Sequence, residues 1–388
     1  MAYKIPLLKF VITYTNLFLY RLTKNVIIAH IIVDKAKHIR FALVGCGAIA
    51  NKHVTAIGRL DNASICGACD IDPKAAQTFQ QKYGIPAYTD AQKMIEETDP
   101  HVLNILTPSG LHGDNIMELM KFNRNFVVEK PFALTLSQID KILEECDKRR
   151  IKIFVIKQNR FNPPIVKLKE ALDKGRFGKL VLATVRVRWR RDDKYYKEKP
   201  WRGTWAYDGG VLTNQASHHI DMLIWLMGQV ESVMAKTATH LADIEADDTG
   251  VAILKFKNGA LGVIEATTAA RPKDLEGSVS VLGQKGTVVV GGFFMNELQT
   301  WEFEDKDEQM DADIWKNYSK VPAVAAWNHT EFFKDVIESL IYDKQGLVGG
   351  IEGRKSVELI HAMYESVETQ KEVFLSFIPK RCRLGVIK

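Results

Sequence analysis

The stretch that most constrains the fold of this chain is IRFALVGCGAIA, residues 39–50. A short apolar run of branched residues enters a Gly-Cys-Gly turn, and a helix-compatible sequence follows. Gly45 suits the tight turn, and Gly47 leaves room for a pyrophosphate to approach the backbone at the positive end of the helix. The pattern predicts a dinucleotide-binding site, whose expected ligands in this turn are Gly45, Gly47, Ala48 and Ile49.

Asp70 lies at the position where a dinucleotide-binding site of this kind carries an acidic residue. The next expected strand, Ala63–Cys69, ends at Asp70, about twenty residues beyond the turn. Asp70 would accept hydrogen bonds from the ribose hydroxyls and would repel a 2′-phosphate. The sequence therefore predicts NAD rather than NADP as the cofactor.

Expected strands alternate with expected helices from residue 39 to residue 158. This alternation predicts an α/β fold whose N-terminal part is a Rossmann domain with a doubly wound parallel sheet. Ligands of such a sheet lie at the carboxyl ends of its strands. The further cofactor ligands predicted at these ends are Thr107, Pro108, His112, Glu129 and Lys130.

Two of these residues have more than one interpretation. Lys130 is either a surface lysine in a turn or an ammonium held against a substrate hydroxyl, with Glu129 setting its orientation. His112 fits a helix cap or the edge of the cofactor better than a catalytic role.

Residues 159–375 have a different pattern, in which expected strands follow one another and Asn258-Gly259 marks a hairpin turn. The pattern predicts an α+β domain with a large, mainly antiparallel open sheet, which would bind substrate and form oligomer contacts. A tail, residues 376–388, follows it. No metal site is expected, because Cys66 and Cys69 have no second ligand pair elsewhere.

The segment from Trp201 to Gly228 is the most informative part of this second half. The sequence predicts a helix from Val211 onward, which would place Asn214, His218 and Asp221 on one face. A helical histidine is often structural, but the near-neutral pKa of the side chain also suits His218 to accept a hydroxyl proton.

The positive charge of the chain is confined to its N-terminus. The formal net charge is +6, and residues 1–40 alone carry seven basic residues against Asp34, so the remainder is neutral and no nucleic-acid partner is expected. Arg186, Arg188 and Arg190 alternate on one strand, which favours a polar sheet face over a nucleic-acid site.

Residues 1–38 fit neither expected domain. They are predicted to be an extension that is absent from the native protein, with Val33 marking the true start; a membrane-surface anchor is the alternative. The odd number of cysteines without framework spacing suits a reducing compartment, so the expected location is the cytoplasm.

At these motifs the chain resembles the Gfo/Idh/MocA family of NAD(P)-dependent sugar oxidoreductases. The resemblance covers about residues 39–375 and rests on the glycine turn, Thr107-Pro108, Glu129-Lys130-Pro131 and the segment from Gly209 to Asp221. Within the family it is most similar to UDP-N-acetylglucosaminuronate 3-dehydrogenases. The residues that carry this closer similarity are residues 155–160 (VIKQNR), Tyr195-Tyr196, residues 201–205 (WRGTW) and residues 214–218 (NQASH).

The resemblance implies that Lys130 and His218 flank the sugar and the nicotinamide, and that one of them accepts the hydroxyl proton. Many family members have aspartate where this chain has Asn214, which implies that Asn214 orients the substrate instead of relaying a proton. The substrate ligands implied by the resemblance are Lys157, Asn159, Arg160, Trp201, Arg202, Asn214 and His218, with Arg160 suited to a carboxylate or a diphosphate.

The activity implied by the resemblance is oxidation of the C3 hydroxyl of a UDP-linked N-acetylated uronic acid to a 3-keto sugar for surface-polysaccharide synthesis. It also implies a homotetramer, and NAD that stays bound and is regenerated with 2-oxoglutarate. The alternatives are another sugar or inositol dehydrogenase of the family, and a non-catalytic NAD-binding regulator.

Overall fold

The computed structural model describes residues 38–319 and 327–386. The expectation that residues 1–38 are a non-native extension therefore falls, except for His38, outside the described residues. Within the described ranges, no helix is both long enough and apolar enough to cross a bilayer.

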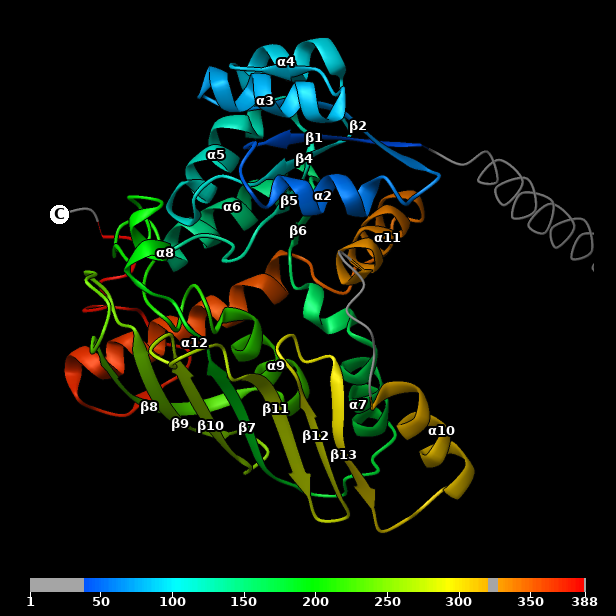
Figure 1. Cartoon of the computed structure of the whole chain (residues 1–388), viewed down its shortest axis with the longest axis vertical. Helices are drawn as coiled ribbons and strands as arrows, with labels where there is room; N and C mark the ends of the chain where they lie inside the picture. The colour runs from blue at the N-terminus through cyan, green and yellow to red at the C-terminus, as the bar shows by residue number, and fades with distance from the viewer. Residues whose placement is uncertain (1–37, 320–326, 387–388) are drawn as a thin grey trace, which may run out of the picture.

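The first sheet has six parallel strands in the order β3-β2-β1-β4-β5-β6 (Figure 1). Its strands are β1 (Ile39–Val44), β2 (Ala63–Cys69), β3 (Ala87–Tyr88), β4 (Val102–Ile105), β5 (Asn125–Val128) and β6 (Ile153–Val155). The connecting helices are α2 (Ala50–Ile57), α3 (Pro73–Tyr83), α4 (Ala91–Thr98), α5 (His112–Leu119) and α6 (Leu136–Arg149), with short 3-10 turns η1 (Ser109–Leu111) and η2 (Met120–Phe122). The strand order reverses between β1 and β4, which is where ligands of a doubly wound sheet bind. The predicted Rossmann sheet is confirmed.

Local sequence signals set the ends of α3. The side chain of Asp72 accepts a hydrogen bond from the N–H of Lys74, and Pro73 occupies the first turn, where its missing N–H costs nothing. Gly84 ends the helix in the left-handed conformation, at φ +67°. Asp72 and Gly84 therefore set the two ends of α3.

The second sheet has eight strands in the order β13-β12-β11-β7-β10-β9-β8-β14. Its strands are β7 (Leu180–Arg188), β8 (Val230–Ala238), β9 (Thr249–Phe256), β10 (Leu261–Thr267), β11 (Glu276–Gly283), β12 (Gly286–Gly291), β13 (Glu297–Phe303) and β14 (Val373–Phe374). Only the pair of β7 and β10 is parallel among the described pairings. The prediction of a mainly antiparallel sheet is confirmed, although β13 and β14 were not predicted.

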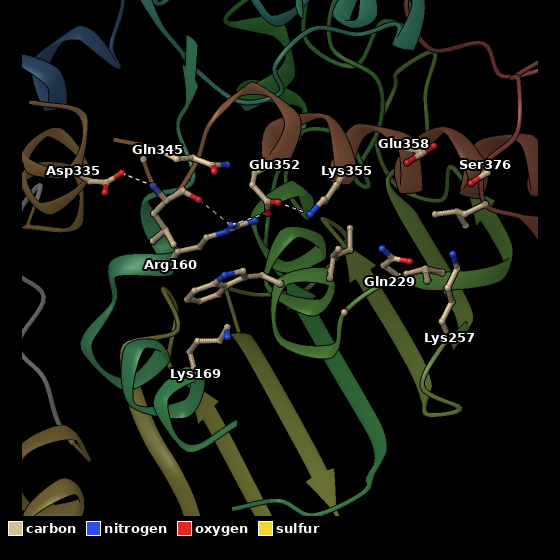
Figure 2. A pocket seen from close by; sticks show the side chains of 17 residues that line it. Arg160, Lys169, Gln229, Lys257, Asp335, Gln345, Glu352, Lys355, Glu358 and Ser376 are labelled. Atoms are coloured by element: carbon tan, nitrogen blue, oxygen red, sulfur yellow. Dashed lines mark hydrogen bonds and ion pairs between the residues drawn. The ribbon is translucent and has the colours of Figure 1, made fainter. Parts of the chain in front are cut away.

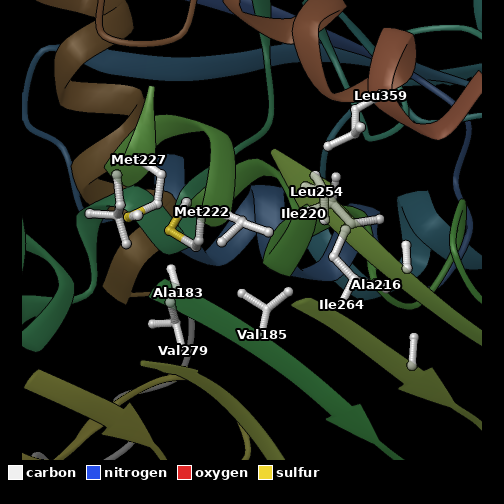
Figure 3. Close-up of a cluster of buried hydrophobic side chains, with 14 of the residues drawn as sticks. Ala183, Val185, Ala216, Ile220, Met222, Met227, Leu254, Ile264, Val279 and Leu359 are labelled. Atoms are coloured by element: carbon white, nitrogen blue, oxygen red, sulfur yellow. The ribbon is translucent and has the colours of Figure 1, made fainter. Parts of the chain in front are cut away.

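Helices cover one face of this second sheet (Figure 1). The helices in contact with its strands are α7 (Pro163–Asp173), α9 (Ser217–Met227), α10 (Glu308–Tyr318) and α12 (Gly350–Thr369). The other helices of this part of the chain are η3 (Gln158–Phe161), α8 (Asp193–Lys197) and α11 (Trp327–Ile341). Figure 3 shows side chains of α9, among them Ile220 and Met222, above Ala183 and Val185 of β7. Alternate residues of β7 are buried, so one face of the strand supplies the core. This apolar contact holds α9 on the sheet.

The core of the first sheet includes residues from the far end of the chain. Phe332, Phe333 and Val336 of α11 are buried in the same apolar cluster as Phe41 of β1. The rings of Phe41 and Phe333 meet edge to face, with their centres 5.4 Å apart. α11 therefore completes the core of the first sheet, although it lies far beyond residue 158 in the sequence.

The expected start of the helix that carries His218 is wrong. The sequence predicted a helix from Val211, whereas α9 begins at Ser217 and the six preceding residues form turns. Contacts with distant residues hold this segment in its turns. The N–H of Val211 donates to the backbone oxygen and to the carboxylate of Asp247, at 2.9 and 3.0 Å, and Lys130 donates to the backbone oxygen of Asn214, an acceptor that a continuous helix would use for itself. Asn214 therefore precedes the helix and does not share a helical face with His218.

The arginines of β7 meet acidic neighbours on the same sheet face. Arg188 forms ion pairs with Glu265 at 2.5 Å and with Glu276 at 3.2 Å, and Arg186 lies 3.7 Å from Glu265. Carboxylates of β10 and β11 thus offset the positive charge. This arrangement agrees with a polar sheet face.

A buried ion pair fastens η3, which follows the first sheet, to α9. The guanidinium of Arg160 donates two hydrogen bonds to the carboxylate of Asp221, both at 2.9 Å, and both side chains are only 2% exposed. The third nitrogen of Arg160 lies 3.3 Å from Glu352 of α12 and 3.5 Å from the backbone oxygen of Leu347 (Figure 2). Burial alone would raise the pKa of Asp221, but Arg160 and Lys157 lower it below its usual value.

This ion pair should contribute strongly to stability. Asp221→Asn removes the buried carboxylate shared by Arg160 and Lys157 and leaves Arg160 only the more exposed Glu352, so we expect it to lower the free energy of unfolding by about 3–5 kcal/mol, measured by urea titration. Because the pKa of Asp221 is lowered in the folded protein, the contribution is present at neutral pH and is lost only as the pH falls below the usual carboxyl range. The control is Glu97→Gln, which breaks an exposed pair with Lys93 and should leave the urea midpoint nearly unchanged. Equal effects of the two variants would contradict the assignment.

Candidate active site

The glycine turn between β1 and α2 leaves open space above the backbone. Gly45 has φ +111°, and a Cβ there would lie 2.9 Å from the backbone of Leu106, so no other residue fits. Gly47 is exposed, and a Cβ at this position would meet nothing within 4 Å. Ala48 is exposed and Ile49 half-buried at the start of α2, which has no side-chain cap. These features fit a pyrophosphate at the N-terminus of α2.

Asp70 is held against this turn at the carboxyl end of β2. Its Oδ2 accepts the N–H of Cys46 at 2.9 Å, and its Oδ1 accepts the N–H of Asp72 at 3.0 Å. Two backbone bonds fix the carboxylate beside the predicted pyrophosphate position. The arrangement fits a ribose whose hydroxyls donate to Asp70.

Thr107, Pro108 and His112 follow the carboxyl end of β4. The ring of His112 is buried, with its two nitrogens 2.7 Å from the backbone oxygen of Pro131 and 2.9 Å from that of Thr107. Burial lowers the pKa of His112, although both oxygens oppose the shift. His112 therefore bridges the loops that follow β4 and β5.

Glu129, at the end of β5, is bound on both sides. Its Oε1 lies 3.0 Å from Nε2 of His53, and its Oε2 accepts the N–H of Lys130 at 3.2 Å. Burial would raise the pKa of Glu129, but the hydrogen bond and charge of His53 outweigh burial and lower it to about 2. The other nitrogen of His53 lies 3.0 Å from the amide of Asn104. Glu129 is therefore a fixed negative charge next to Lys130.

Lys130 reaches across from the first sheet to the segment before α9. Its Nζ donates to the backbone oxygen of Asn214 at 2.7 Å and to Oδ1 of Asn214 at 3.1 Å. Burial lowers the pKa of Lys130, while the charges of Glu129 and Asp208 oppose the shift. The structure thus brings together two predicted site residues that lie 84 positions apart in the sequence.

His218 lies in the first turn of α9 beside η3. Its Nε2 is 3.2 Å from the side-chain amide of Gln158, and its Nδ1 has no hydrogen-bond partner among the described residues. Burial, followed by the charges of Lys130 and Lys157, lowers the pKa of His218 well below 6.5. The imidazole is therefore neutral at pH 7 and offers a lone pair.

Three residues predicted to bind substrate lie in the protein interior. Arg160 is fully occupied by Asp221, Glu352 and Leu347, so its expected contact with a substrate anion is not supported. Lys157, only 1% exposed, donates to Ser356 at 2.6 Å and lies 3.7 Å from Asp221. Asn159 is buried in the same short helix, η3.

Trp201 and Arg202 lie on the turns that follow α8. Arg202 donates to the backbone oxygen of Tyr195 at 2.6 Å, and its guanidinium lies 4.0 Å from the centre of the Tyr195 ring. The hydroxyl of Tyr195 accepts from the amide of Gln215 at 3.1 Å. Arg202 is thus linked through Tyr195 to the residue that follows Asn214.

Asp208 is the member of this cluster that the sequence analysis missed. It is 1% exposed, and its Oδ1 accepts from the amide of Asn214 at 2.5 Å. The sequence does contain a sign that Asp208 is buried: its carboxylate directly precedes Gly209-Gly210, in a segment where most neighbours are apolar or aromatic. His53 was missed as well, because its contact with Glu129 spans 76 positions of sequence.

Comparisons with known proteins agree with this architecture. The NAD-binding Rossmann-fold model of the Gfo/Idh/MocA oxidoreductase family matches residues 39–157, and the C-terminal alpha/beta-domain model of the same family matches residues 169–375. A myo-inositol 2-dehydrogenase from Thermotoga maritima is 26% identical over 343 residues, which cover 87% of this chain and 98% of that protein.

Two solved structures are more similar in sequence. The WlbA dehydrogenase from Chromobacterium violaceum, in complex with NADH and UDP-GlcNAcA, is 38% identical with a TM-score of 0.82, covering 89% of this chain and 98% of that chain. The WlbA dehydrogenase from Bordetella pertussis, with the same two ligands, is 37% identical with a TM-score of 0.81, covering 88% and 99%.

The family match and the geometry of the glycine turn confirm NAD as the cofactor. The chain belongs to the Gfo/Idh/MocA oxidoreductase family and is an NAD-dependent dehydrogenase that acts on a CH–OH group of a sugar or polyol.

Proposed function

We propose that this enzyme oxidises the C3 hydroxyl of UDP-N-acetylglucosaminuronic acid to a 3-keto sugar. The observation that carries the proposal is the similarity, at 37–38% identity over nearly the whole chain, to WlbA dehydrogenases whose structures contain UDP-GlcNAcA. The cluster of Lys130, Asn214 and His218 supplies the acid–base groups that such an oxidation needs.

His218 is assigned as the proton acceptor. Burial and two nearby lysines keep its ring neutral, so a lone pair is available at pH 7. Lys130 lies between the acidic groups of Glu129 and Asp208 and acts as an ammonium that binds the hydroxyl oxygen and stabilises the negative charge that develops on it. Asn214 holds Lys130 in place through two oxygen atoms.

The NAD site is assigned to the glycine turn and to the strand ends described above. NAD⁺, when bound, supplies the hydride acceptor. Gly45, Gly47, Ala48 and Ile49 would hold the pyrophosphate, and Asp70 would bind the ribose. The loops that carry Thr107, Pro108, His112, Glu129 and Lys130 would border the nicotinamide. Trp201, Arg202 and Asn214 are assigned to binding of the UDP-sugar. Arg160 and Lys157 are assigned a structural role, because both pair with Asp221 on the helix that carries His218.

The wider setting is also part of this proposal. We place the enzyme in the cytoplasm as a homotetramer that supplies a keto sugar for surface-polysaccharide synthesis, with bound NAD regenerated by 2-oxoglutarate. Support for self-association comes from the outer face of the second sheet, which exposes Met234, Val251, Ile253 and Leu261.

The second candidate function is oxidation of inositol, because a myo-inositol 2-dehydrogenase matches 87% of the chain. The two candidates require different substrates but the same acid–base groups. A substrate panel therefore separates them.

The purified protein should produce NADH from UDP-N-acetylglucosaminuronic acid, seen as absorbance at 340 nm, and not from myo-inositol. If bound NAD is regenerated, 2-oxoglutarate added afterwards should abolish the signal. Oxidation of inositol alone would favour the second candidate. No NADH with any sugar or polyol of the panel would favour the non-catalytic regulator.

Removal of either acid–base group should reduce turnover. We expect His218→Asn and Lys130→Met each to lower kcat by roughly 10²-fold to 10⁴-fold, because proton transfer and stabilisation of the oxyanion would be lost. His240→Asn, at an exposed histidine outside the site, is the control and should keep full activity. Unchanged turnover in His218→Asn would refute its role.

The ring of His218 should stay neutral where an ordinary histidine is protonated. We expect its ¹⁵N signals, identified by their loss in His218→Asn, to stay at the neutral position at about pH 6.5, where an ordinary histidine is half protonated. The reason is that burial and the charges of Lys130 and Lys157 lower the pKa of His218. A titration with a midpoint at about pH 6.5 would contradict the assignment of a neutral base.

A further inference from the structure

Asp208 occupies a buried position behind the cluster of Lys130 and Asn214. Its Oδ2 accepts the N–H of Gly203 at 2.8 Å, and its Oδ1 accepts from Nδ2 of Asn214 at 2.5 Å. The charge of Arg202 influences Asp208, but its guanidinium binds Tyr195 and Glu198 instead. The carboxylate of Asp208 is therefore fixed by two donors and faces Asn214 directly.

The amide of Asn214 can satisfy both of its neighbours in only one orientation. Its NH₂ group points to Asp208, and its oxygen points to the ammonium of Lys130, 3.1 Å away. If the amide of Asn214 were flipped, its NH₂ group would face the ammonium of Lys130, so two donors would meet. Its oxygen would face the carboxylate of Asp208, so two acceptors would meet. Asp208 therefore determines that the oxygen of the Asn214 amide, and not its NH₂ group, faces Lys130.

We propose that Asp208 is a positioning residue that fixes the orientation of the Lys130 ammonium through the amide of Asn214, a role that rests on the dehydrogenase function proposed above. Asp208 touches neither Lys130 nor the open part of the site. It acts by holding Asn214, whose two oxygen atoms hold Lys130.

Charges of both signs act on Lys130. Glu129 and Asp208 are the negative groups, and Lys52, Arg191 and Lys157 are positive. Burial raises the pKa of Asp208 to about 7, although Gly203, Lys130, Arg202 and Asn214 oppose the rise. At about pH 8 the carboxylate form of Asp208 predominates, so experiments at that pH examine the charged form.

An exchange of the two side chains tests the proposal. In Asp208→Asn, the new amide can still accept from Gly203, but its NH₂ group meets the NH₂ group of Asn214, so Asn214 must turn its own NH₂ toward Lys130. We expect kcat to fall by roughly 10²-fold, the scale of a misplaced catalytic group, with little change in the KM for NAD. The double variant Asp208→Asn/Asn214→Asp restores every donor and acceptor with the same net charge, and should recover most of this loss.

Asn214→Asp alone completes the double-mutant cycle. It places two carboxylates at hydrogen-bond distance, so we expect it to be impaired as well. Activity of the double variant no better than that of either single variant would overturn the proposal. So would an unchanged kcat in Asp208→Asn.

A second measurement does not depend on the substrate. Competitive acetylation with acetic anhydride at about pH 8, read by peptide mass spectrometry against exposed Lys52, reports how much of Lys130 is the free amine. We expect Lys130 to react several times faster in Asp208→Asn and in Asn214→Ala, and at the wild-type rate in the double variant. Asn214→Ala keeps Asp208 in place, so it tests the link even if Asp208→Asn fails to fold.

The two readouts separate the possible failures. A wild-type enzyme that oxidises no UDP-sugar would defeat the proposed function, while the labelling of Lys130 would still test the role of Asp208. If Lys130 is labelled at the same rate in the wild type, Asp208→Asn, Asn214→Ala and the double variant, Asp208 has only a packing role. That result would overturn the positioning role.

Discussion

The ion pair of Arg160 and Asp221 is the interaction on which the arrangement of the site depends. It lies where the chain leaves the first sheet, and it joins that exit to the helix that carries His218. Glu352 extends the contact to α12. Because the charges are buried, each must remain paired. His218 therefore has a fixed position relative to the strand ends of the Rossmann sheet.

Two negatively charged side chains, Glu129 and Asp208, lie near Lys130. Glu129 is held ionised by His53, and Asp208 is held by Gly203 and Asn214. Neither carboxylate forms a direct ion pair with the lysine. The positive charge of Lys130 is thus balanced by nearby carboxylates that its Nζ does not contact, and the proposed role leaves one of its three N–H donors for a substrate oxygen.

Much of the fold could be predicted because its signals are local. The bounds of β2 and α3 follow from short runs of sequence and from the caps at Asp72 and Gly84. The start of α9 could not be predicted, because the turns before it are held by residues distant in sequence: Asp247 accepts from Val211, and Lys130 donates to the backbone oxygen of Asn214. Arg160 was assigned to the substrate for the same reason: its partner Asp221 lies 61 positions away.

The packing of α11 against the first sheet affects the order in which the chain can fold during synthesis. Phe332 and Phe333 fill a core that begins with Phe41, so the cofactor-binding half stays incomplete until nearly the whole chain has left the ribosome. Domains commonly fold in order of synthesis, N-terminal first. Here the first half must wait for the second, and a fragment that ends at residue 158 would expose the apolar surface that α11 normally covers.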